Sequence, residues 1–145
     1  MVVGPGGSPA VEHIHRAQEE RFRVESGRIA FRLSGKEEIA EPGTEVTVPP
    51  GQPHFWWNAG DTDAKLSVDL RPALRTEEFF DSFFRLAREG KTDKNGLAGF
   101  LQSIAMVREL GDSHPYLARP PIRMQKAAAF LLSPVARVLG RPALP

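Results

Sequence analysis

The sequence predicts a mainly β protein, a small antiparallel barrel followed by two or three C-terminal α-helices. Two observations lead to this prediction. Up to about Arg71 the apolar residues alternate with polar ones in short runs bounded by Gly, Pro or Ser-Gly, as in strands with one solvated face. After Pro72 the apolar spacing becomes that of an amphipathic helix. We therefore expect a β-barrel over residues 1–72 and a helical extension over residues 73–145, packed on the barrel or on a partner subunit.

The β half contains several short candidate strands. Residues 21–25 and 28–33 each alternate, and Ser26-Gly27 separates them as a turn. Further strands are marked by apolar residues at Val46, Val48, Leu66, Val68 and Leu70. Many short strands at close spacing indicate a sandwich or a barrel.

The helical half contains three candidate helices. Thr76 is a candidate N-cap for the first, with Glu77 and Glu78 placed for the helix dipole. The apolar stripe of this helix comprises Phe79, Phe80, Phe83, Phe84 and Ala87. The second is expected over about 97–110 and ends at Gly111. Its inward residues are expected to be Leu97, Phe100, Leu101 and Ile104. The third begins near Ile122 and is expected to break or kink at Pro134.

Composition narrows the function classes. A chain of 145 residues has room for one main hydrophobic core. Its formal net charge of +1 gives no strong positive electrostatic potential that would attract nucleic acid. It contains no cysteine, so any metal must be held by nitrogen and oxygen ligands. No run approaches the roughly 18 apolar residues of a membrane span, and we expect a soluble, cytoplasmic protein.

Three histidines and one glutamate in the β half form a candidate metal site. His13 and His15 are two residues apart, so in an extended chain they leave the same face. Glu20 is in phase with the apolar residues of the next strand, whereas Glu19 is not. His54 follows a Pro-Pro-Gly turn. Three imidazoles and a carboxylate suit one divalent ion such as Fe, Mn, Ni, Co or Zn.

The spacing of these residues resembles the two motifs of the cupin superfamily. The first motif is matched by Gly7, His13, His15, Glu20 and Gly27, and the second by Gly43, Pro49, Gly51, His54 and Asn58. The resemblance covers about residues 4–71 and is greatest to small bacterial cupins with a helical tail. It implies a jelly-roll barrel with a metal ion inside, bound by His13, His15, Glu20 and His54.

The chain departs from the cupin pattern at its start. Cupin barrels usually have one or two strands before the first motif, whereas here the motif begins almost at residue 1. An uncovered sheet edge would need a partner strand or the tail helices. We therefore expect a homodimer.

Other aromatic and polar residues have expected places. Phe22, Phe31 and Trp56 are expected to line the substrate pocket, although core packing is the favoured interpretation for both Trp56 and Trp57. Trp57 should point the other way. Asn58 should bond its own turn, and His114 should be solvated in a loop.

Function is less constrained than the site. One hypothesis is a divalent-metal-dependent oxygenase or isomerase acting on a small organic molecule, since such a site leaves coordination positions open. The other is a non-catalytic module that binds or senses a small ligand. Residues 113–145 contain five bases and no acid. A cationic amphipathic segment can lie on an anionic membrane surface. We favour instead a helix packed on protein, with its basic face in water and with Met124 and Leu131 inward, and membrane contact is the weaker alternative.

Overall fold

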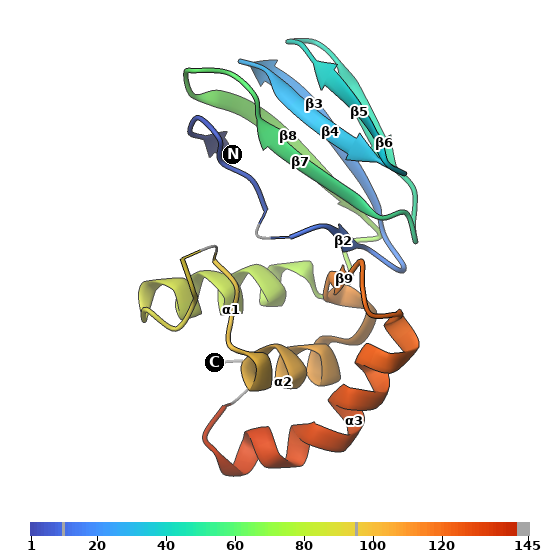
Figure 1. Cartoon of the computed structure of the whole chain (residues 1–145), viewed down its shortest axis with the longest axis vertical. Coiled ribbons are helices and arrows are strands. Elements are labelled where there is room, and N and C mark those ends of the chain that lie inside the picture. The colour runs from blue at the N-terminus through green and yellow to red at the C-terminus, as the bar shows by residue number, and fades with distance from the viewer. Residues whose placement is uncertain (10, 95, 142–145) are drawn as a thin grey trace. The chain divides into compact units, whose positions relative to one another are not determined.

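The structure is a computed structural model that describes residues 1–9, 11–94 and 96–141. It divides into two compact units, Met1–Pro72 and Ala73–Pro145, which Figure 1 shows as a β unit and a helical unit. The positions of the two units relative to one another are not determined. Each unit is therefore described by itself.

The first unit consists of short strands. They are β1 (Val2–Val3), β2 (His13–Ile14), β3 (Glu19–Ser26), β4 (Ile29–Leu33), β5 (Lys36–Ala40), β6 (Glu45–Val48), β7 (His54–Asn58) and β8 (Ala64–Arg71). One antiparallel sheet has the order β1-β8-β3-β6, and β5, β4, β7 and β2 are successive neighbours in the other.

The core of this unit lies between the two sheets, because both contribute side chains to one buried cluster. The first sheet supplies Phe22, Val24, Val48, Ala64 and Leu66, and the second supplies Ile29, Phe31, Ala40 and Trp56. Burial alternates along β3, where even-numbered residues from Glu20 to Val24 are buried and Arg21 and Arg23 are exposed. The two-residue period of a strand is the cause.

The sequence predicted a closed barrel, whereas the described residues form two sheets that share no strand. The edge elements are too short to close the structure. β1 and β2 have two residues each, and β6 is followed by Pro49 and Pro50, which lack the N–H that a further ladder bond would need. The first unit is therefore a two-layered antiparallel β structure.

The second unit contains three α-helices. They are α1 (Thr76–Arg88), α2 (Phe100–Leu110) and α3 (Ile122–Val138), with the 3-10 turn η1 (Gly111–Ser113) and the short strand β9 (Tyr116–Leu117) between α2 and α3. Leu86 of α1 packs with Met106 and Leu110 of α2, and Ala129 of α3 packs with Val107 and Tyr116. Among the described residues, no helix is long and apolar enough to cross a membrane.

Several expectations for these helices are wrong in detail. Thr76 is the first residue of α1, whose N-cap is Arg75 and makes no side-chain cap bond. The buried residues of α1 are Ser82 and Leu86, while Phe84 is 52% exposed. α3 continues through Pro134, so the helix is not broken there, and the expected kink stays a prediction.

The inward faces of α2 and α3 also differ from those expected. Phe100 is 67% exposed, Met124 56% and Leu131 68%, while Ser133 is only 6% exposed. Small residues face inward on α3, namely Ala129, Ser133 and Ala136. The prediction placed the most hydrophobic side chains on the inward faces. In the structure, close packing between helices favours small side chains there.

Gly27, in the turn between β3 and β4, provides a test of this packing. Its φ is +79°, and a Cβ atom added there would lie 2.7 Å from both Cα and Cβ of Ala64. We expect Gly27→Ala to lower the free energy of unfolding by about 2–4 kcal/mol, from left-handed strain plus overpacking. Gly35→Ala is the matched control, because Gly35 has φ +80° but nothing within 4 Å of its added Cβ. Urea denaturation should show the larger loss for Gly27→Ala, and equal losses would contradict the close approach to Ala64.

Candidate metal centre

Three neighbouring elements of the β unit bring the four predicted ligands together. His13 is on β2, directly opposite His54 at the start of β7, and Glu20 is on β3. One ligand atom from each of His13, His15, Glu20 and His54 can be chosen so that all lie within 4.8 Å of one another. The Pro-Pro-Gly turn holds the remaining histidine, because the Gly51 N–H donates to the carbonyl of His15 at 2.9 Å.

Backbone carbonyls orient two of the imidazole rings. Nδ1 of His13 is 3.1 Å from the carbonyl oxygen of Val11, and Nδ1 of His54 is 3.1 Å from that of Gln52. A carbonyl oxygen can only accept, so each Nδ1 donates the proton. In a neutral ring protonated at Nδ1, Nε2 carries a lone pair that points away from the carbonyl oxygen. Metal-ligating histidines are usually oriented by a hydrogen bond of this kind.

The contact between His54 and Glu20 is unusual for a site that contains protein atoms alone. Nε2 of His54 lies 2.8 Å from Oε2 of Glu20, and His54 is fully buried. Because Nδ1 holds the proton of the neutral ring, Nε2 and the carboxylate oxygen would direct lone pairs at each other. A proton or a cation is needed to stabilise them. His15 adds a further nitrogen, with Nε2 at 3.4 Å from the same oxygen.

The electrostatics of the cluster favour neutral His13 and His15 beside an ionised Glu20. Burial, followed by the nearby His54 and His15 rings, lowers the pKa of His13 from 6.5 to about 4. Burial also lowers the pKa of His15. For Glu20, burial alone would raise the pKa, but the interactions with His54 and with the other two histidines lower it overall. These are the protonation states in which histidine and glutamate bind metal ions.

The three predicted pocket residues lie beside the cluster and pack in the core. Phe22 is in ring contact with His54, Phe31 and Trp56, at centroid distances of 6.4, 5.0 and 6.0 Å respectively. All three aromatic side chains are at most 8% exposed. They form an apolar wall behind His54, and their contact with a substrate stays a prediction.

Other residues considered in the sequence lie outside the cluster. The Asn58 amide donates to the carbonyls of Val3 and Thr62 at 2.8 Å and accepts from the Gly60 N–H, so it bonds the turn as expected. Trp57 stacks on Phe55. His114 was expected to be solvated, but its ring packs edge-on against Phe79 at 5.2 Å within the helical unit.

Gln18 is a residue at the site that the sequence reasoning missed. It is 1% exposed, and its side chain acts to raise the pKa of His15 against the larger, lowering effect of burial. Its Nε2 donates to the carbonyl of Pro72 at 2.9 Å, which holds the amide in place. The signal was present, because residue 18 is in phase with Glu20 and Phe22.

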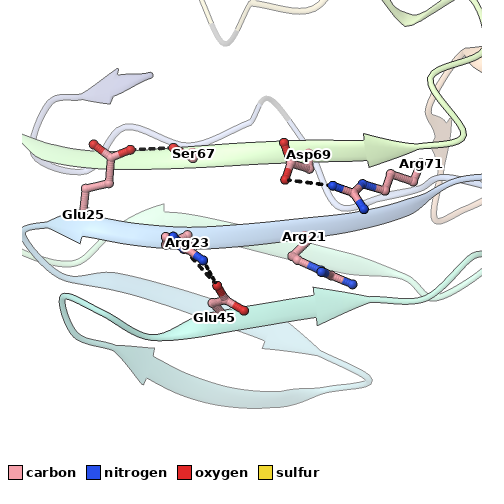
Figure 2. A pocket seen from close by; sticks show the side chains of 7 residues that line it. All are labelled: Arg21, Arg23, Glu25, Glu45, Ser67, Asp69 and Arg71. Atoms are coloured by element: carbon pink, nitrogen blue, oxygen red, sulfur yellow. Dashed lines mark hydrogen bonds and ion pairs between the residues drawn. The ribbon is translucent and has the colours of Figure 1, made fainter.

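The opposite face of the first sheet contains a separate, charged groove of about 540 Å³. Its lining residues, shown in Figure 2, are Arg21, Arg23, Glu25, Glu45, Ser67, Asp69 and Arg71. Arg23 pairs with Glu45, and Arg71 lies 3.8 Å from Asp69. Three arginines against three carboxylates leave no net charge, so this groove is the solvated face of the sheet and not a specific ion site.

Comparisons with known proteins agree with this geometry. The cupin-domain family model matches residues 1–70. An oxidoreductase of Arthrobotrys oligospora is 29% identical over 122 residues, which cover 79% of this chain and 47% of the relative. The chain therefore spans about half the length of that relative.

Solved structures similar to the chain align with about half of it. A protein of Thermus thermophilus is 25% identical with a TM-score of 0.45, over 48% of this chain and 65% of that one. A predicted oxalate decarboxylase of Thermotoga maritima is 26% identical with a TM-score of 0.46, over 48% and 60%. The family model spans nearly the whole β unit, and its residues include the His/Glu cluster. Through residues 1–70, the chain belongs to the cupin superfamily.

Proposed function

We propose that this protein binds one divalent metal ion through His13, His15, Glu20 and His54, and that it is a metal-dependent oxygenase acting on a small organic molecule. The observation that supports the metal is the 2.8 Å approach of Nε2 of His54 to Oε2 of Glu20. With Nδ1 of His54 already donating to Gln52, a cation satisfies both atoms at once.

The donor set fits such an ion. Three imidazole nitrogens and one carboxylate oxygen suit Fe, Mn, Ni, Co or Zn, and the chain has no thiolate that would select a softer site. A bound ion of this kind would supply Lewis acidity and, if redox-active, a place for dioxygen.

The protein's own residues would hold and shield the site. Hydrogen bonds to the carbonyls of Val11 and Gln52 fix two rings before any ion binds, which lowers the cost of assembling the ligands. Phe22 packs beside His54 and, with Phe31 and Trp56, keeps water from that side of the cluster.

Oxidative chemistry is favoured over isomerisation by one comparison. The relative from Arthrobotrys oligospora that aligns with 79% of this chain is named an oxidoreductase. Isomerisation and non-catalytic ligand binding are the alternatives, and the same metal site would serve either. Both differ from an oxygenase in consuming no dioxygen.

Metal content should depend on Glu20 and not on Glu19. Glu20 is 6% exposed and faces the three histidines, whereas Glu19 pairs with Arg21 at 3.1 Å. We expect Glu20→Gln to lower metal affinity by about 10–100-fold and Glu19→Gln to leave it unchanged. Among the four histidines, His54→Ala should lose the metal and His114→Ala should keep it. Elemental analysis of protein purified without chelators measures all four variants, and metal loss in Glu19→Gln alone would contradict the assignment.

The metal should be released by acid and not by moderate alkali. Protons compete with the ion for imidazole nitrogen, and burial holds the pKa of His13 at about 4, below its ordinary 6.5. His13 is therefore neutral at about pH 7 and gains a proton only as the pH falls toward about 4. Bound metal, measured after equilibration across this range, should stay near its full value down to about pH 6 and then decline. Release that begins above about pH 7 would contradict this order of titration.

Turnover is tested by oxygen uptake once the native metal has been identified and restored. With a panel of small oxygen-bearing organic compounds, we expect consumption of dioxygen that needs both metal and compound. His54→Ala should abolish it, and His114→Ala should retain it. A metal-loaded protein that converts a compound without consuming dioxygen would be an isomerase. One that binds a compound without converting it would be a binding module.

A further inference from the structure

α3 leaves several of its bulky apolar side chains exposed on the unit to which it belongs. Phe130 is 64% exposed, Leu131 68%, Val135 48% and Val138 87%. We call these four residues the outer stripe, because their spacing places them on one side of a helix. Exposed groups of large apolar residues mark contact surfaces more often than single exposed ones do.

The inward face of α3 explains why the outer stripe is left over. Ala129, Ser133 and Ala136 are the buried residues of the helix, and Ala129 packs with Val107 and Tyr116. Small side chains allow α3 to approach its neighbours closely at these positions, whereas the four large side chains of the outer stripe remain exposed. The outer stripe therefore needs a partner outside it.

The charge around the outer stripe indicates which partner. Residues 113–141 contain no acid, and Arg119, Arg123, Arg137 and Arg141 are all exposed. Lys126 is the exception, since it pairs with Asp112 at 2.7 Å. Arg108 of α2 lies 5.3 Å from the ring centre of Phe130, so a further cation sits at the stripe itself.

These charges disfavour a second copy of the chain as the partner. An antiparallel pair of α3 helices would bring Arg123 of one copy toward Arg137 of the other, with no carboxylate on either helix to offset the repulsion. An anionic lipid surface has the opposite property, because it accepts apolar side chains at the acyl boundary and arginines at the phosphates.

We propose that α3 docks on the surface of an anionic phospholipid bilayer, with the outer stripe at the headgroup–acyl boundary and with Arg123, Arg137 and Arg141 on lipid phosphates. α3 lies along such a surface and does not cross it, in keeping with its length of 17 residues and its three internal bases. This docking is independent of the metal site and of the proposed enzymatic activity.

The test is co-sedimentation of the full-length protein with vesicles. Wild type should bind vesicles of phosphatidylcholine with phosphatidylserine much more tightly than pure phosphatidylcholine vesicles, and salt should weaken the binding. Leu131→Gln with Val138→Gln should weaken it at least about tenfold by removing apolar insertion. Arg137→Gln with Arg141→Gln should weaken it by about fivefold for each charge.

The matched control is Val2→Gln with Ile39→Gln, which changes two exposed apolar residues of the β unit and should leave vesicle binding unchanged. Circular dichroism and metal content of each variant show that it is folded. The proposal is overturned if wild type binds neither kind of vesicle. It is also overturned if the outer-stripe variant converts a dimer to a monomer while vesicles stay unbound, since the stripe would then be an interface between copies.

Discussion

The candidate metal centre depends on one buried contact between the two sheets, that between Nε2 of His54 and Oε2 of Glu20. The two residues come from different sheets, β7 in one and β3 in the other, so the contact forms only if both strands keep their register. A one-residue slip of either strand would turn its side chain to the solvent face. The apolar residues that follow in phase, Phe22 on β3 and Trp56 on β7, fix that register because they belong to the shared core.

The same contact makes the metal-free cluster a source of instability. Four titratable groups lie together with little access to water, and an uncompensated buried charge costs several kcal/mol. The protein limits this cost by keeping His13 and His15 neutral and Glu20 ionised. The aromatic core behind His54 supplies the stability that the cluster lacks. A divalent cation would convert a group of opposed lone pairs into a set of bonds, so binding and folding of this unit should be linked.

The strands and the His/Glu cluster could be predicted from the sequence because side chains alternate between the two faces of a strand, so the face of one residue determines the face of its neighbours. Once Phe22 and Val24 face the core, Glu20 must face it too, and His54 follows from the turn before it. The open edges of the two sheets could not be predicted in this way, since the length over which strands pair depends on segments that are distant in the sequence. Gln18 was not predicted at the site because glutamine is not a usual metal ligand, although its position is in phase with Glu20 and Phe22.

The predicted inward faces of the helices were wrong for a different reason. Leu131 and Phe84 are more hydrophobic than Ser133 and Ser82, yet the serines are inside, and only the neighbouring helices decide that.

Both units depart from the usual rule of burial, and in opposite directions. The β unit buries a carboxylate and two histidines at 8% exposure or less, and the helical unit exposes a phenylalanine, a leucine and two valines along one helix. Buried polar groups and exposed large apolar groups are the informative exceptions in a soluble protein. Each lowers the stability of its own unit unless a partner is present, a cation in the first case and an apolar boundary in the second. The two partners differ in kind, because one is a small cation and the other an extended anionic surface, so each can be removed or supplied without the other.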